Sequence, residues 1–434
     1  MIMERIINIL SDIKGLDGWK INEKTTESKE IFFIKKNIDM VRSKDVQHIS
    51  LTVYKDFEED GVKYRGSSLV DIHPTMGEEE IREVIEGAVY SAGFVKNKYY
   101  PLVKPSYVKT GEIENTFDKD SLSNWISRLS KEAFVSDKHE KGWINSLELF
   151  LDKNKHRVIN SEGVDISYGS YRGELEFITN WQEAGEEIEL YEDLLFSDYQ
   201  ENFIIDAVDE MLKISRDKAL AIPTPQLKDI PIILTGDPVK EFFDYYYSKS
   251  SARAIYEGTS TAKIGESIQG SEVFGDRISM FLDPDLKNSI LSSPFDGEGQ
   301  KLSKVEIYKD GILKRYWGNK RFSHYLGIET TGFIQNIVVG GGSKGLSELK
   351  EGKYVELTAF SDFEMDPVTG DFAGEIRLGW YNDGNKTIPI TGGSISGNIN
   401  EVHGDMYLSK EIQNRNNFMG PKSMKIRNVD IVSG

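Results

Sequence analysis

Residues 230–247 read IPIILTGDPVKEFFDYYY, and this stretch decides how the second half of the chain folds. Ile230–Leu234 is a short apolar run, which predicts a buried strand. In the turn Gly236-Asp237-Pro238 that follows, the aspartate is placed to cap a helix and the proline lies at its first position. The next residues predict a packed helix, since its apolar face carries Val239, Phe242, Phe243 and Tyr246.

The parts of the chain before and after this stretch differ in sequence pattern. Downstream, as far as Gly434, glycine and short β-like runs predict a mostly antiparallel β domain with one early helix. Its expected strands include Val305–Lys309, Tyr354–Thr358 and Gly374–Tyr381. Upstream, two prolines in Ile222-Pro223-Thr224-Pro225 are expected to prevent regular structure. We therefore place the domain boundary there, between residues 1–222 and residues 223–434.

The first half mixes helical and strand patterns, which predicts an α+β fold built on a β-meander with a mixed or antiparallel sheet. The expected helices are Glu4–Ile13, a second opened by a capping box at Thr75-Met76-Gly77-Glu78, Asp118–Phe134, and a fourth capped by Ser197-Asp198. The expected strands are Trp19–Lys24, Glu30–Lys35, Ile49–Tyr54, Val62–Leu69, Trp143–Leu151 and Glu174–Asn180. Pro101–Gly111 has the prolines and glycine of a linker.

Composition excludes several classes of function. The chain has 434 residues, enough for about two or three domains. It has no cysteine, which excludes disulfides, thiolate metal sites and cysteine nucleophiles. With 53 basic and 71 acidic side chains the net charge is −18, which argues against direct binding of nucleic acid. No apolar run has the length of about 18 residues expected of a membrane helix, so we expect a cytoplasmic protein.

Local motifs do not define an active site. None of the six histidines lies within five positions of another, so no local zinc clamp exists. The acidic run Asp362–Asp366 lacks the glycine of an EF-hand and is better explained as an acidic turn before Gly370. The spacing of Val338–Lys344 does not match a phosphate loop, and the turn cluster Ser292–Gly299 has no nucleophile elbow. In the run Tyr245–Tyr247, at least one ring is expected to face a cleft or a partner.

Several loop motifs of the second half together resemble the TldD/PmbA family. They are Gly258-Thr259-Ser260 with Gly265-Glu266, Phe281-Leu282-Asp283-Pro284, Ser293–Gly299, Lys309–Leu313, Leu326-Gly327, Thr330-Thr331-Gly332, Gly370-Asp371-Phe372 and Gly397-Asn398-Ile399. The resemblance implies a role in peptide processing or proteolysis in the cytoplasm. Members of the family have also been called modulators of DNA gyrase. The negative charge agrees better with the peptide role.

The family has two arms, and the residues here resemble the arm without a metal site. The TldD-like arm has H-E-x-x-x-H on the helix after the boundary strand and a cysteine near the C-terminus. The two histidines and the cysteine bind the metal, and the glutamate is the catalytic base. The resemblance places Phe243, Asp244 and Ser248 at the positions of the motif, and Met419 near the position of the cysteine. Because these side chains replace the ligands, the resemblance implies a PmbA (TldE)-like chain with no catalytic residue, no metal and no cofactor.

Three functions remain open at this point. The first is a non-catalytic subunit that forms a hetero-oligomeric protease with a TldD-like metalloprotease and presents a substrate peptide by strand addition. The second is an enzyme with a rebuilt carboxylate site drawn from Asp244, Asp283, Asp362 and Asp366. The third is a peptide-binding homodimer without a protease partner. The residues expected to line a peptide cleft are Tyr245, Tyr247, Asp362 and Asp366.

Overall fold

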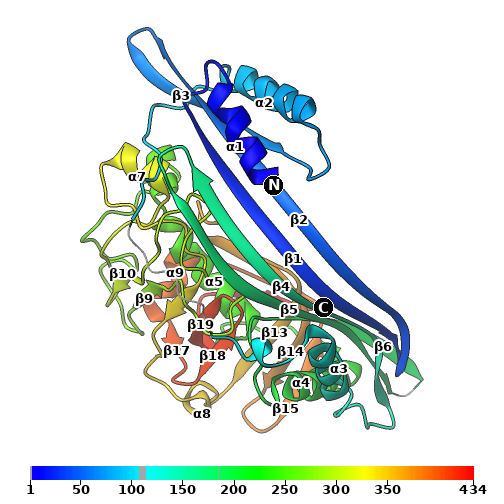
Figure 1. The fold of residues 1–434 in the computed structure, drawn as a ribbon. Coiled ribbons are helices and arrows are strands. Elements are labelled where there is room, and N and C mark those ends of the chain that lie inside the picture. Colours follow the sequence, from blue (N-terminus) through cyan, green and yellow to red (C-terminus); the bar gives the residue numbers. More distant parts are fainter. Residues whose placement is uncertain (1, 107–113, 184) are drawn as a thin grey trace.

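The computed structural model describes residues 2–106, 114–183 and 185–434 (Figure 1). Part of the predicted linker Pro101–Gly111 falls on residues 107–113 and lies outside the described residues. The fold is α+β, as the sequence predicts. The structure contains three sheets, one formed by residues 18–196 and two formed by residues 222–432. Within the described ranges, no helix has the length and apolar character needed to cross a membrane.

The first sheet is long and antiparallel and runs diagonally across the molecule (Figure 1). Its strands, in spatial order, are β3 (Val62–Asp71), β2 (Asn37–Glu59), β1 (Gly18–Ile34), β4 (Gly142–Asn160), β5 (Asp165–Glu183) and β6 (Glu186–Phe196). The sheet consists of two three-stranded meanders joined by the pairing of β1 with β4. The strands are longer than the sequence predicts. The two segments expected at residues 19–24 and 30–35 are one strand, and β6 was not predicted at all.

Cross-strand ion pairs explain why β1 continues through a polar stretch. Glu30 is only 1% exposed, and its carboxylate binds the side chains of Arg42 and Lys44 on β2. Burial alone would raise the pKa of Glu30, but the hydrogen bonds and charges of Lys44 and Arg42 outweigh it and lower the pKa below 4.5. The charged partners thus take the place of an apolar pattern and hold the strand in register.

This pairing predicts a pH effect. Because the folded state lowers the pKa of Glu30, the stabilisation is present above pH 4.5 and is lost as the pH falls through the lowered value. We expect Glu30→Gln to cost about 1–2 kcal/mol at pH 7, a modest value because both partners are about half exposed. Urea unfolding between pH 3 and pH 7 checks this. A loss that stays constant over the whole range would contradict the assignment.

Four helices cover the two ends of the first sheet (Figure 1). At one end α1 (Ile2–Asp12) and α2 (Glu78–Ala92) enclose a core with β2. At the other end α3 (Leu122–Ala133) and α4 (Phe203–Ala219) pack on β4, β5 and β6. The helix expected at residues 118–134 is divided, because a 3₁₀ turn at Thr116–Lys119 precedes α3 and Ser121 caps it by accepting from the Asn124 amide at 3.2 Å.

Three predicted helix caps are wrong. Gly77 precedes α2 and makes no side-chain cap, so the box expected at residues 75–78 does not form. The residue before α4 is Asn202, since the carboxylate of Asp198 instead accepts from the Thr116 amide at 2.9 Å. Gly236 precedes the helix α5 (Asp237–Lys249) and adopts φ 80°, a left-handed conformation that favours glycine, so Asp237 is the first helical residue.

The second half contains the other two sheets (Figure 1). The smaller has the order β11 (Ile312–Leu313), β10 (Val305–Lys309), β9 (Met280–Leu282), β12 (Ile337–Val339), β19 (Phe418–Pro421) and β18 (Ile412–Arg415). The larger has the order β17 (Tyr407–Leu408), β20 (Ser423–Ile426), β8 (Ile232–Thr235), β13 (Tyr354–Met365), β14 (Asp371–Asn382), β15 (Thr387–Thr391) and β7 (Ile222–Pro223). In addition, β16 (Ser394–Asn398) pairs with β14, and β21 (Asp430–Val432) pairs with β16.

The early helix of this half is α5 (Asp237–Lys249), and side chains of both smaller and larger sheets pack around it in one core. Short helices lie on the loops, namely α6 (Ala252–Glu257), α7 (Lys320–Leu326), α8 (Leu346–Leu349), α9 (Ile399–Val402) and a 3₁₀ turn at His403–Asp405. The sequence was wrong about residues 222–223, which form β7 parallel to β15. Pro223 is tolerated because β7 is an edge strand. The domain division at residue 222 stays our proposal.

Candidate functional site

The helix α5 lies at the centre of the C-terminal core. Phe242, Phe243 and Tyr246 are fully buried on it, as the apolar stripe predicts. The ring of Phe243 stacks on Phe418 of β19, with 5.9 Å between the centroids and 26° between the planes. It also lies 5.8 Å from the ring of Tyr246. The fold therefore brings β19 to the side of α5 and fills the space between them with aromatic carbon.

The four positions implied to replace metal ligands lie in this region. Phe243 is in the core, and Met419 follows Phe418 on β19 with its side chain partly buried. Asp244 forms an ion pair with Lys240, one turn earlier, at 3.1 Å, and Ser248 is partly buried near the end of α5. Within the described residues, no group of three or more His, Cys, Asp and Glu side chains could hold a metal ion. The correspondence with metal ligands stays a prediction.

The three consecutive tyrosines, Tyr245–Tyr247, all pack against other parts of the protein. Tyr246 is fully buried, and Tyr245 is 5% exposed. Tyr247 stacks on Trp317 at 4.3 Å and donates its hydroxyl to the Ile334 carbonyl at 3.0 Å. Burial raises the pKa of all three phenols. Each ring is therefore held by the protein, and the assignment of Tyr245 and Tyr247 to a peptide cleft stays a prediction.

The two acidic residues proposed for the cleft lie on β13 and just after it. Asp366 follows the strand, and its carboxylate accepts from the amides of Val368 and Thr369 at 2.7 and 3.0 Å, which lowers its pKa. This is the acidic turn predicted before Gly370. Lys249 of α5 donates to the Val368 carbonyl and lies over the Tyr245 ring, so the fold brings Tyr245 and this turn together. Asp362 is exposed on β13.

The four carboxylates of the rebuilt-site hypothesis do not pair with one another. Asp283 forms an ion pair with Lys304 at 3.0 Å, whereas Asp244 pairs with Lys240. Burial raises the pKa of Asp244, against the opposing attraction of Lys240. Among the described residues, no hydrogen bond connects any two of these four side chains. A carboxylate dyad shares a proton through such a hydrogen bond, and the rebuilt-site hypothesis stays a prediction.

A loop at residues 293–299 explains part of the family resemblance. Asp296 is 6% exposed, and its two carboxylate oxygens accept from the amides of Glu298, Gln300 and Phe333 at 2.9 to 3.1 Å. Burial raises the pKa of Asp296, while these amides oppose the rise. Gly299 adopts φ 82°, and a Cβ there would lie 2.7 Å from Val164 on the loop after β4. The motif thus closes a turn against the first sheet.

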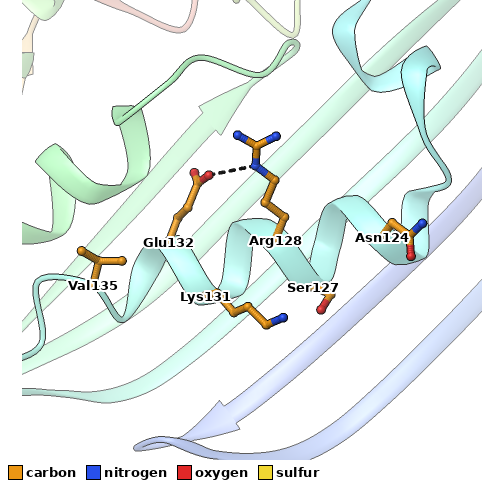
Figure 2. Close-up of a pocket in the computed structure, with 6 residues that line it drawn as sticks. All are labelled: Asn124, Ser127, Arg128, Lys131, Glu132 and Val135. Carbon is orange, nitrogen blue, oxygen red and sulfur yellow. Dashed lines mark hydrogen bonds and ion pairs between the residues drawn. The ribbon is translucent and has the colours of Figure 1, made fainter.

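Two cavities were not anticipated. The larger, of about 430 Å³, lies along the outer face of α3 (Figure 2). All its lining residues come from α3 and the residues just after it, namely Asn124, Ser127, Arg128, Lys131, Glu132 and Val135. Figure 2 shows the ion pair between Arg128 and Glu132. The two side chains are 3.1 Å apart, and each also forms a hydrogen bond with the Tyr199 hydroxyl. We assign no chemistry to this surface.

The second cavity, of about 300 Å³, lies between the first sheet and the loop at Asp296-Gly297. Its walls come from β1, β2, β4 and β5, and include Lys24, His48, His156 and Tyr168. The sequence could not reveal it, because these residues are far apart in the chain and meet only through strand register.

Comparison with known protein families gives a match in the second half of the chain. Residues 227–433 match the family described as PmbA/TldA metallopeptidase C-terminal domain. The second half of the chain therefore carries a C-terminal domain of this family. A protein of Escherichia coli O157:H7 named metalloprotease PmbA is 23% identical over 194 residues, which cover 43% of this chain and 42% of that protein. An uncharacterized protein of Methanocaldococcus jannaschii is 27% identical over 164 residues, 35% of this chain and 39% of that protein.

These alignments cover less than half the length of either relative. The similarity in fold is wider. TldE from Thermococcus kodakarensis superposes with a TM-score of 0.81 at 18% identity, covering 100% of both chains. A Thermotoga maritima protein whose name refers to modulation of a DNA gyrase gives a TM-score of 0.79 at 16% identity, covering 99% of this chain and 100% of that one. The chain thus shares its fold with these proteins along its whole length.

Proposed function

We propose that this chain is a PmbA/TldE-like subunit of a peptidase complex in which a TldD-like metalloprotease subunit holds the metal. The observation that carries the proposal is the packing of Phe243 on Phe418, because it occupies the place that the resemblance assigns to metal ligands. An aromatic ring has no lone pair suited to a metal, and removal of a core ring is costly. The likeness in fold to TldE supports the same arm of the family.

The remaining features support peptides as the substrate class. The net charge of −18 disfavours nucleic acid as a ligand. The absence of cysteine is compatible with the cytoplasm, where disulfides are rare, and we place the complex there. In this proposal the chain supplies walls and peptide contacts, in the region of Tyr245 and the Asp366 turn, and the partner supplies the hydrolytic water and its base.

Reconstitution tests this function. We expect the purified chain to leave unstructured peptides intact, and a mixture with a TldD-like chain that has an intact H-E-x-x-x-H to cleave them in a chelator-sensitive way. The reason is that only the partner provides ligands for the metal. Peptide cleavage followed by mass spectrometry is the measurement. The matched control is the same mixture with the glutamate of the partner's motif replaced by glutamine, which should remain inactive.

Sedimentation of the two chains separates the alternatives. Co-sedimentation at a fixed ratio supports the hetero-oligomer. Self-association of this chain with no binding to a TldD-like chain would instead favour the peptide-binding homodimer. Chelator-sensitive hydrolysis by this chain alone, free of contaminants, would overturn both and favour a metal site within it.

A further inference from the structure

Four side chains form a row across the first sheet. The register places His48 of β2 opposite Lys24 of β1, Lys24 opposite His156 of β4, and His156 opposite Tyr168 of β5. Residues directly opposite one another on neighbouring strands point to the same face of a sheet. The row therefore presents an ammonium group between two imidazoles, with a phenol beside the second imidazole.

The row forms the floor of the cavity of about 300 Å³, and the loop at Asp296-Gly297 forms one wall. This volume is at the lower end of the range for ligand pockets, which starts at about 300 Å³. The cavity thus has contributions from both halves of the chain, the sheet from the first and the loop from the second. It is separate from the α5 region on which the proposed function rests.

Lys24 is the unusual group in this cavity. Its side chain is half-buried, and it has no hydrogen bond or ion pair within the described residues. Neither carboxylate of the lining bonds to Lys24, since Glu23 accepts from Gln47 at 2.6 Å and Asp296 accepts from three amides. Arg157, the other cation of the lining, binds Asp165 through two hydrogen bonds of 2.9 Å. A partly desolvated ammonium without a counter-ion favours an anion from outside.

The state of His156 reflects burial and the neighbouring charge of Lys24. Its ring stacks on Tyr168 at 4.7 Å, and its Nε2 lies 3.1 Å from the Ser170 hydroxyl. Burial, followed by the charge of Lys24, lowers the pKa of His156 to about 4. The imidazole is therefore neutral at pH 7. The lining thus carries two cations, Lys24 and Arg157, and two carboxylates, Glu23 and Asp296, and Lys24 is the cation that no carboxylate pairs within the described residues.

We propose that the cavity binds a carboxylate, with the Lys24 ammonium as its main partner and the His48 imidazole at its side. A carboxylate fits because its two oxygens can accept from both groups at once. Either the free C-terminus of a peptide or a small organic acid has this chemistry. The inference does not depend on a protease partner or on the absence of a metal from this chain.

Calorimetric titration of the full chain with three probes tests the proposal. The probes are trialanine with a free C-terminus, trialanine amide and N-acetylglycine. We expect trialanine to bind at least tenfold more tightly than its amide, and Lys24→Met to weaken its binding about tenfold to a hundredfold, because a charge-assisted hydrogen bond is lost. Lys155→Met is the matched control. It removes the same charge from the position before His156, on the opposite face of β4, and should leave binding unchanged.

The two sources of carboxylate give different results. Equal affinity for N-acetylglycine and trialanine assigns the cavity to small acids, whereas a clear preference for trialanine assigns it to peptide C-termini. The NMR titration of His156 provides a second readout. Its pKa should rise in Lys24→Met without ligand, and in the wild type when trialanine is bound. Equal binding of the acid and the amide, no binding of either acid at millimolar concentration, or no effect of Lys24→Met would overturn the proposal.

Discussion

Replacement of Phe243 by alanine is expected to destabilise the C-terminal core by about 3–5 kcal/mol, a large effect for a single side chain. The ring is fully buried and contacts Phe418 and Tyr246, so its loss leaves a cavity between α5 and β19. Surrounding strands of two sheets constrain these neighbours, which limits how far the core can collapse around the gap. Urea unfolding followed by near-ultraviolet circular dichroism measures the change in midpoint.

The same substitution at an exposed phenylalanine serves as the control. Phe274 is 75% exposed, and Phe274→Ala should change the free energy of unfolding by about 0.5 kcal/mol or less. Similar losses for the two variants would show that Phe243 is not part of a packed core. In that case the main support for a non-catalytic role would fail, because the volume could then accept a ligand.

Asp296→Ala is expected to have the second large effect, about 3 kcal/mol or more. The substitution removes the acceptors of three amides, those of Glu298, Gln300 and Phe333, and leaves these donors unsatisfied beside a buried position. The loop would also lose its fixed shape against the first sheet, where Gly299 packs on Val164. Thermal unfolding and hydrogen exchange of the three amides measure the loss.

Two variants show whether the acceptor atoms of Asp296 are responsible. Asp296→Asn keeps the oxygen that accepts from Glu298 and Gln300 and should cost clearly less than alanine. Asp285→Ala removes an exposed carboxylate from the same region and should have an effect of about 0.5 kcal/mol or less. An Asn variant as unstable as the Ala variant would instead assign the role of Asp296 to its charge.

The sequence predicted those parts of the fold in which local pattern and tertiary structure agree. The strand Val305–Lys309 and the packed face of α5 are confirmed, because apolar spacing alone determines them. The α+β class is confirmed for the same reason. The length of β1 could not be predicted, since the polar stretch around Glu30 is held by Arg42 and Lys44 of another strand.

The contacts at the candidate sites also could not be predicted where they join residues far apart in the sequence. The burial of Phe243 followed from the stripe on α5, but its stacking partner Phe418 is 175 positions away and could not be read from spacing. Tyr247 packs on Trp317, which no local pattern indicates. The row that includes Lys24 and His156 depends on the register of long strands, and the alternation of polar residues within each strand leaves this register undetermined.

The account as a whole rests on the absence of a metal site between α5 and β19, and equilibrium dialysis of the purified chain against zinc tests this most directly. We predict no stoichiometric zinc at pH 7, and no change in zinc content when Asp244 is replaced by asparagine. One zinc bound per chain, lost in Asp244→Asn and located beside residues 237–258 by anomalous scattering, would contradict the central claim.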